Sequence, residues 1–177
     1  MSPRQLRYES HVFPEPKALK DILRRSPSVR HTLFIDGVPK NFIGPRYKAD
    51  STVTVLERPG GDAILRFGSS GLSDAIGVHL ATGNVVEVIS VRDLPLLFVN
   101  TSIEKFTLTV KAVIDRFPYY EEDATDEEVE AAAADVGDII ERIDPAAMIP
   151  DRYWSTFVDD MEMRDLSTEE VLAAEFE

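Results

Sequence analysis

The 177-residue sequence contains no cysteine, which excludes disulfide bonds, thiolate metal sites and thiol nucleophiles. Histidine is nearly absent as well. His11, His31 and His79 are far apart, and no two of them have the H-x-x-x-H spacing of a zinc site. His79 lies in a strand-like segment beside Gly77, where we interpret it as a surface or sheet-packing residue. The sequence therefore indicates no metal site.

The motifs of common enzymes are missing too. There is no G-x-S-x-G elbow for a serine nucleophile and no Walker A loop for nucleotide phosphates. The acidic run at 121–128 lacks the glycine and the ligand spacing of an EF-hand calcium loop. No apolar run approaches the roughly 20 residues of a membrane helix, and the N-terminus lacks the apolar core of a signal peptide. We therefore expect a cytoplasmic protein that is not an enzyme, needs no cofactor and has no membrane partner.

Positive charge is scarce in the last third of the chain. Residues 121–177 carry 3 Arg against 20 Asp and Glu, a net charge of −17. Residues 1–120 carry 16 Lys and Arg against 12 Asp and Glu, a net charge of +4. So negative a segment repels nucleic acid and anionic membranes and attracts basic partners. It is either a solubilising surface or a binding surface, and composition gives the two interpretations about equal weight.

The sequence does contain a regular pattern of β-strands around residues 75–89. Ile76, Val78 and Leu80 alternate with residues of the opposite face, as the side chains of a half-buried strand do. Gly83-Asn84 follows and can form a tight turn, because glycine is free to adopt positive φ. This stretch therefore predicts a β-hairpin.

A second hairpin is expected just before the first, at residues 52–67. Its two halves are rich in β-forming residues and flank Pro59-Gly60-Gly61-Asp62, which has the composition of a turn. The segment 68–74, rich in glycine and serine, joins the two hairpins. We interpret it as a flexible loop, because a phosphate-binding glycine loop is followed by a helix, whereas a strand follows here.

The clearest amphipathic pattern comes after the strands, at residues 102–117. Its apolar residues, among them Phe106 and Val113, recur at three- and four-residue spacing and form one stripe. Thr101 stands three residues before Glu104, which is the spacing of a capping box. We expect this helix to pack on the sheet through its apolar stripe.

Each of the other expected helices has a recognisable start: Glu15-Pro16, Thr125 with Glu128, Asp151, and Ser167 with Glu170. Ser26-Pro27 closes the first of these helices, and the second runs to about Ile143. Residues 166–177 form either the last short helix or a mobile acidic tail. Trp154, the only tryptophan, is expected in the core on its helix.

Strands come first in this order and most of the helices afterwards, which argues for an α+β fold. We expect one domain over residues 1–177, with a mainly antiparallel or mixed sheet of hairpins packed by helices. Its C-terminal part would be helical and acidic.

Several short motifs occur in order along the middle and C-terminal two-thirds of the chain: Ile76-Gly77, Leu80-Ala81-Thr82-Gly83 with Val85-Val86, Phe98-Val99-Asn100-Thr101-Ser102 with Phe106, Ile143-Asp144-Pro145 and Tyr153-Trp154-Ser155. Their order and spacing resemble the fourth subfamily of the SUKH superfamily. Members of that superfamily are immunity proteins that neutralise polymorphic toxins of competing bacteria, alongside some regulatory relatives. The resemblance implies a non-catalytic binding protein.

The function implied by the resemblance is that of an antitoxin, which binds and neutralises a cognate toxin. Many antibacterial toxins act on nucleic acid through basic clefts, and the −17 segment would complement such a cleft. The alternative is a regulatory or scaffolding protein of the same fold with an endogenous partner. An adjacent toxin gene distinguishes the two. An enzyme with scattered catalytic carboxylates is a third hypothesis, which the missing motifs disfavour.

The candidate toxin-binding residues are aromatic or acidic and belong to the C-terminal part: Tyr119, Tyr120, Glu121, Glu122, Asp123, Asp126, Glu127, Glu130 and Tyr153. The acidic ones would speed association with a basic surface, and exposed tyrosines would anchor the complex. We expect a monomer or weak homodimer that does not bind nucleic acid.

Overall fold

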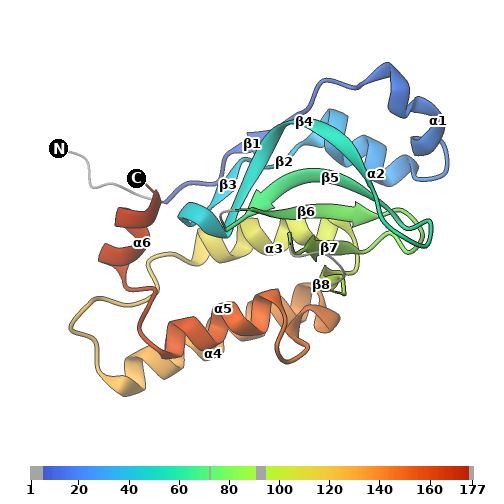
Figure 1. The fold of residues 1–177 in the computed structure, drawn as a ribbon. Coiled ribbons are helices and arrows are strands. Elements are labelled where there is room, and N and C mark those ends of the chain that lie inside the picture. Colours follow the sequence, from blue (N-terminus) through green and yellow to red (C-terminus); the bar gives the residue numbers. More distant parts are fainter. Residues whose placement is uncertain (1–5, 72, 91–94, 176–177) are drawn as a thin grey trace.

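The computed structural model describes residues 6–71, 73–90 and 95–175, and places an antiparallel sheet over a layer of helices (Figure 1). Within the described residues, the main sheet has the strand order β3-β4-β5-β6-β7-β8, with every neighbouring pair antiparallel. Its strands are β3 (Asn41–Phe42), β4 (Tyr47–Glu57), β5 (Ala63–Ser70), β6 (Asp74–His79), β7 (Val85–Val88) and β8 (Leu97–Asn100). Two short strands, β1 (Ser10–His11) and β2 (Val38–Pro39), pair separately.

The α-helices of the described residues are α1 (Lys20–Leu23), α2 (Pro27–His31), α3 (Ile103–Arg116), α4 (Asp126–Ile143), α5 (Tyr153–Glu162) and α6 (Thr168–Glu175). Short 3₁₀ or π turns are η1 (Lys17–Leu19), η2 (Thr32–Asp36), η3 (Gly44–Arg46) and η4 (Pro145–Met148). Helices α3 and α5 contact strand β8 of the sheet, and α4 packs on both of these helices. The α+β prediction is confirmed.

Both predicted hairpins are present. The β4–β5 turn contains Gly60 and Gly61, both with φ near +90° (92° and 87°), which only glycine adopts without strain. In the β6–β7 hairpin, Val78 lies opposite Val85, and Gly83 has φ +79° in the turn between them. The alternation around Ile76 and the β-forming residues at 52–67 thus predicted both hairpins. Strand β6 is buried on both faces, however, and not half-buried as expected.

The glycine- and serine-rich segment corrects one expectation, because most of it is strand rather than loop. Gly68 lies opposite Ala49 on one side and Ile76 on the other, and Ser70 lies opposite Asp74. A β-carbon on Gly68 would stand 2.4 Å from the Tyr47 ring. Glycine is therefore required here by close packing in a strand and not by flexibility.

Helix α3 packs on the sheet through the predicted stripe. Phe106, Val110 and Val113 are all fully buried. The Phe106 ring centroid lies 5.2 Å from that of Tyr47 and 5.8 Å from that of Phe67, so side chains of α3, β4 and β5 form one aromatic cluster. On α5, Trp154 and Phe157 pack in the same way against Phe42 of β3, at 5.6 and 5.3 Å. The core role of Trp154 is confirmed.

The start of α3 differs from the prediction by one residue. Ser102, not Thr101, is the N-cap, and its hydroxyl accepts from the Lys105 N–H at 3.2 Å. Thr101 is used elsewhere: its N–H and its hydroxyl both donate to Asp144, at 2.7 and 3.0 Å. Thr101, which local spacing predicted as the helix cap, therefore binds the buried carboxylate of Asp144 instead.

Asp144 lies between α4 and η4, and its side chain is 1% exposed. Besides Thr101, it accepts from the Asn100 amide at 3.0 Å and from the half-exposed Lys105 ammonium at 3.4 Å. The Asn100 carbonyl in turn accepts from the Trp154 indole at 2.9 Å. This polar network joins β8, α3, η4 and α5.

Two further boundaries correct the sequence prediction. Pro27 does not close the N-terminal helix but begins a new one, α2, where proline is favoured at the first position. Asp151 does not cap α5, because it lies one residue too early in a left-handed conformation, with φ +58°. The N–H of Arg152 instead donates to Ser155 Oγ at 3.0 Å.

At the C-terminus, Ser167 and Glu170 form reciprocal cap bonds of 3.3 and 3.1 Å, and helix α6 follows. Leu166 and Val171 are buried in the same core as the rest of the fold. Of the two alternatives for this segment, the structure has the helix up to Glu175; residues 176–177 lie outside the described part.

Candidate functional site

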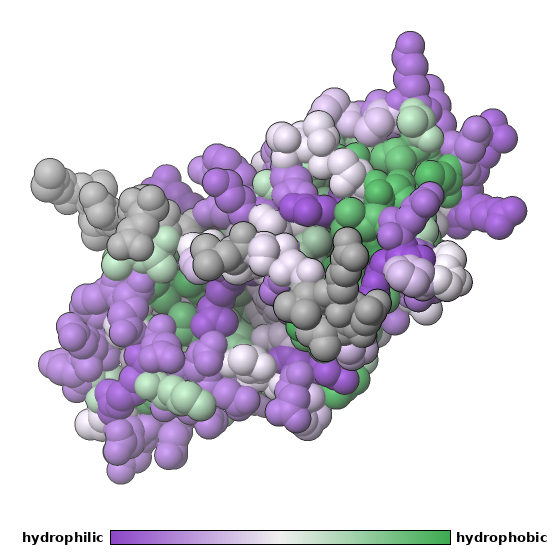
Figure 2. Space-filling model, in the orientation of Figure 1, coloured by the Kyte–Doolittle hydropathy of each residue, from purple (hydrophilic) through white to green (hydrophobic). Residues whose placement is uncertain are grey.

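The acidic part of the chain occupies one end of the molecule. Hydrophilic side chains cover most of the region over α4 and α5, at the lower left of Figure 2. Among them are six exposed carboxylates that precede or begin α4, which we call the acidic surface: Glu121, Glu122, Asp123, Asp126, Glu127 and Glu130. Their exposure leaves them available to a partner.

The first turn of α4 is fixed by the predicted capping box. Thr125 Oγ1 accepts from the Glu128 N–H at 3.3 Å, and Glu128 accepts from the Thr125 N–H at 2.8 Å. The carboxylates of this turn also lie at the positive end of the helix dipole. Negative charge is therefore concentrated where the helix itself stabilises it.

Replacing Thr125 by alanine is expected to lower the free energy of unfolding by about 1 kcal/mol, since the cap bond to Glu128 is lost. Urea denaturation measures this change. Thr125→Asp should stay within about 0.5 kcal/mol of the parent protein, because aspartate caps a helix as well as threonine does. If Thr125→Ala and Thr125→Asp lower the free energy of unfolding equally, the cap bond does not contribute to stability.

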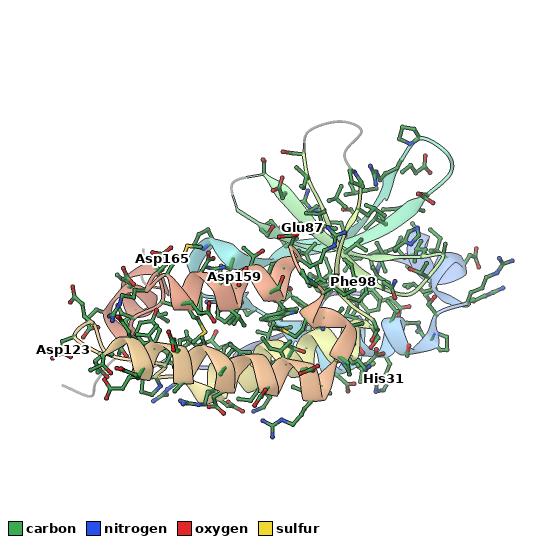
Figure 3. All side chains as sticks on the ribbon, turned by 90° about the horizontal axis from the view of Figure 1, so that it is seen from below. His31, Glu87, Phe98, Asp123, Asp159 and Asp165 are labelled. Carbon is green, nitrogen blue, oxygen red and sulfur yellow. The ribbon has the colours of Figure 1, made fainter. Side chains whose placement is uncertain are left out.

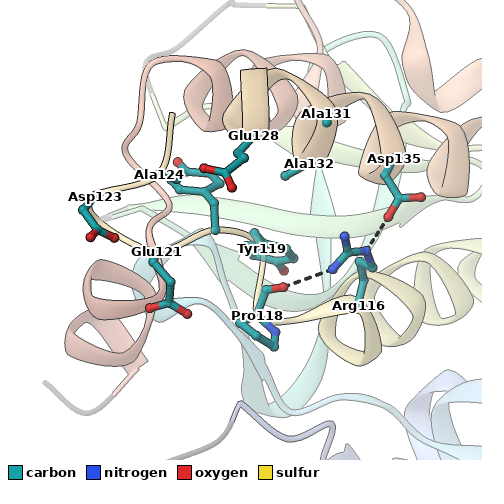
Figure 4. Close-up of a pocket in the computed structure, with 11 residues that line it drawn as sticks. Arg116, Pro118, Tyr119, Glu121, Asp123, Ala124, Glu128, Ala131, Ala132 and Asp135 are labelled. Atoms are coloured by element: carbon teal, nitrogen blue, oxygen red, sulfur yellow. Dashed lines mark hydrogen bonds and ion pairs between the residues drawn. The ribbon is translucent and has the colours of Figure 1, made fainter. Parts of the chain in front are cut away.

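A cavity of about 720 Å³ opens between the end of α3, the loop that follows it and α4 (Figure 4). Its charged lining comprises Arg116, Glu121, Asp123, Glu128 and Asp135. Arg116 forms an ion pair with Asp135 across the two helices and also donates to the Pro118 carbonyl at 3.0 Å. Among the described residues of the lining, four carboxylates stand against one guanidinium, which is already paired, so this lining is acidic.

Two of the predicted anchors, Tyr119 and Tyr120, are not exposed, which corrects that expectation. Each side chain is 6% exposed. The Tyr119 hydroxyl donates to the Val113 carbonyl at 3.1 Å, and the Tyr120 hydroxyl donates to the Met161 carbonyl at 2.9 Å. Burial raises the pKa of both phenols. These rings are core residues that hold the loop to α3 and α5, because each has an apolar body and a local acceptor for its hydroxyl.

The third aromatic candidate, Tyr153, lies at the other end of α5 and is half-buried. Its hydroxyl donates to the Arg46 carbonyl at 2.9 Å, and burial raises its pKa. Of the candidate residues, the structure therefore brings Glu121, Asp123 and the largely buried Tyr119 and Tyr120 into the lining of the acidic cavity. The other members of the acidic surface lie outside it. Tyr153 is separated from all of them.

The loop that carries the acidic surface is bonded to the C-terminal segment. The Tyr120 carbonyl accepts from both the N–H and the hydroxyl of Thr168, each at 2.9 Å. Arg164 donates to the Ala124 carbonyl at 2.9 Å and to the Asp126 carboxylate at 2.6 Å. The loop is therefore positioned before any partner arrives.

Sequence reasoning missed Arg116, Glu128 and Asp135 as cavity residues. Glu128 and Asp135 are seven residues apart and so lie on one face of α4. This spacing could have indicated that the two carboxylates line the same cavity. Arg116 lies on a different helix, α3, and no pattern near it in the sequence predicts that it lines this cavity.

The structure gives no indication of a metal centre or a membrane span within the part of the chain that it describes. No group of three or more His, Asp and Glu side chains is arranged to hold a metal ion among those residues. None of the helices described is both long enough and apolar enough to cross a bilayer.

Comparison with known proteins gives one match. The SUKH-4 immunity protein family matches residues 15–160, which include every strand of the main sheet and helices α1 to α4. No match was found among curated proteins, and none among solved structures. Because the match spans most of the sequence, the chain belongs to the SUKH-4 immunity protein family.

Proposed function

We propose that the protein binds a cognate polymorphic toxin and neutralises it, with the acidic surface directed at a basic region of the toxin. Membership of the SUKH-4 immunity protein family is the observation that carries this proposal. The fold adds a surface suited to it, because six exposed carboxylates lie on a loop and helix start that are already ordered.

Charge supports the choice of this surface. The chain carries −17 after residue 120 and +4 before it, so a basic partner is drawn towards the helical end of the molecule. A toxin that acts on nucleic acid has a basic cleft for phosphates, and carboxylates compete for the same groups. The protein would then act by occupying that cleft, and it needs no catalytic group or cofactor of its own.

The apolar contact that such a complex requires needs an exposed side chain, and Tyr119 and Tyr120 are largely buried. Met163 is 69% exposed and directly precedes Arg164, which contacts the acidic loop. An exposed apolar side chain bordered by charges is a typical interface anchor, because its burial excludes water from the surrounding ion pairs. We propose Met163 for this role.

The experiment is direct: the toxin domain encoded beside this gene is purified with and without the protein. A stable complex and loss of toxin activity at equimolar protein are expected. An unrelated toxin serves as the control and should remain active. No complex with the neighbouring toxin, together with stable binding to a cellular protein, would establish the regulatory alternative instead.

A further inference from the structure

A second cavity, of about 310 Å³, lies where one end of the sheet meets the start of α5. Its lining comes from η3, the end of β5, the inner face of β7, the start of β8 and the first turn of α5: Pro45, Arg46, Ser70, Glu87, Leu97 and Tyr153 are among its residues. Of the candidate toxin-binding residues selected from the sequence, Tyr153 alone lies in this lining.

The walls of this cavity are joined by hydrogen bonds. Gly71, at the end of β5, donates its N–H to the Pro45 carbonyl at 2.6 Å. Tyr153, on α5, donates its hydroxyl to the Arg46 carbonyl at 2.9 Å. Sheet, η3 and α5 are therefore connected around the cavity, and its shape does not depend on a ligand.

Glu87 is the unusual residue of this lining. It follows Val85 by two positions in β7, so its side chain leaves the sheet on the face that Val85 buries in the core. The buried Ser70 hydroxyl donates to it. Burial raises the pKa of the Glu87 carboxyl, and the neighbouring Asp74 charge adds to this effect, while the Ser70 bond opposes it. No ion pair joins Glu87 to a described Lys, Arg or His.

The positive charge of Arg46 at this cavity is compensated. Arg46 is bound by Asp160 at 2.6 Å and stacks over the Phe157 ring at 5.0 Å. Arg152 and the exposed Asp151 also line the cavity, and among the described residues no ion pair joins them to each other or to Glu87. Among the described residues, Glu87 is thus a half-buried carboxylate near another anion, Asp74, and is in no ion pair. A cationic group entering the cavity would offset the cost of desolvating it.

The geometry of the Glu87 carboxylate favours a lysine over an arginine as the cation that binds it. A guanidinium binds a carboxylate best through both of its oxygens, and at Glu87 it would have to share one of them with the Ser70 hydroxyl. An ammonium is a compact charge that one oxygen can bind. Its aliphatic stem can lie against apolar side chains, which Leu97 and Pro45 provide here.

We propose that this cavity receives a lysine side chain of the toxin, with the ammonium bound to Glu87 and the stem against Leu97 and Pro45. This inference rests on the proposed function. One partner can reach both places, because α5 runs from this cavity towards the acidic loop and its ten residues span about 15 Å. In Figure 3, the labelled residues Glu87, Asp159, Asp165 and Asp123 follow one another along this direction.

The first arm of the test uses a small probe, Nα-acetyl-lysine methylamide, titrated into the labelled protein and followed by amide NMR. Shifts are expected at Ser70, Glu87 and Tyr153, and the uncharged Nα-acetyl-norleucine methylamide should cause none. In Glu87→Gln the shifts should disappear, because the ammonium loses its anionic acceptor. Glu57→Gln, the same change at an exposed position of β4, should leave them unaltered. Shifts that are absent in the parent protein, or that persist in Glu87→Gln, would refute the site.

The second arm measures affinity for the adjacent-gene toxin. Glu87→Gln is expected to weaken binding by roughly 10- to 100-fold, the effect of losing one charge-assisted hydrogen bond. Glu57→Gln should not. If the parent protein binds the toxin and Glu87→Gln binds equally well, the lysine assignment is wrong while the proposed function stands. If the parent protein does not bind the toxin, the proposed function fails, and probe shifts that depend on Glu87 would assign the cavity to a free amine instead.

Discussion

Replacing Asp144 by alanine is expected to lower the free energy of unfolding by about 3–5 kcal/mol, as breaking a buried charged contact does. The carboxylate is 1% exposed and accepts from the Asn100 amide and from two donors of Thr101. Without it, these donors remain inside the protein with no acceptor, and each costs free energy. Lys105 adds little, because its side chain is 41% exposed and its charge is screened by water. Urea denaturation measures the loss.

Two variants test this explanation. Asp159→Ala removes an exposed carboxylate from α5 and should change stability by no more than about 0.5 kcal/mol. Asp144→Asn keeps one acceptor oxygen and should lose clearly less stability than Asp144→Ala. If Asp144→Ala and Asp144→Asn each lower the free energy of unfolding no more than Asp159→Ala does, the network does not have this role.

The stability of the parent protein should also depend on acid through Asp144. Burial alone would raise the pKa of this carboxyl, but the bonds from Thr101 and Asn100 and the Lys105 charge outweigh burial and hold the pKa below its ordinary value. The ionised form is therefore favoured in the folded state. Its contribution is complete above about pH 5 and is lost as the pH falls through the folded pKa. Asp144→Asn should show a smaller loss of stability over the same pH range.

Reversing two charges of the acidic surface is expected to slow association with the toxin by about tenfold or more at low salt. Glu127→Lys with Glu130→Lys changes the local charge by four, and neither residue has a role in the cap of α4. Long-range attraction then no longer steers the toxin to this end of the molecule. Stopped-flow mixing over a range of ionic strengths measures the effect, which should fade as salt screens charges beyond about 10 Å.

The matched control reverses two charges at the opposite end, Asp21→Lys with Glu57→Lys, which are both exposed. Association should then be unchanged or only slightly slower, because the added positive charges lie far from the acidic surface. Dissociation should change little in either variant, because it depends on buried contacts. An association rate that is insensitive to salt and equal in both variants would make the acidic surface merely solubilising.

The local patterns of the sequence were reliable where one segment determines its own structure. The alternation around Ile76 and the glycines near Gly60 placed two hairpins, and the stripe containing Phe106 placed α3 on the sheet. Thr125 and Glu128 formed the expected capping box. Each of these features depends on neighbours within a few residues, so the sequence contains the necessary information.

The candidate site was predicted less well, because exposure depends on the whole fold. Glu121 and Asp123 are exposed as expected, but Tyr119 and Tyr120 are buried by contacts with α3 and α5. Their hydroxyls found acceptors at Val113 and Met161, and no sequence pattern shows such pairings. For Glu87 the sequence does contain one indication, because it is the single charged residue in the apolar run from Val85 to Ile89.

The sequence by itself determined the α+β class, the hairpins, the helical stripes and the unequal charge of the two parts, since each arises from composition or short-range periodicity. Only the tertiary structure decided that Thr101 serves Asp144 rather than the helix cap, and that Glu87 faces a cavity with no described cation bonded to it. The physical reason is the same for both residues. A buried polar group must find its partner among side chains that folding brings close, and their separation along the chain does not reveal that proximity.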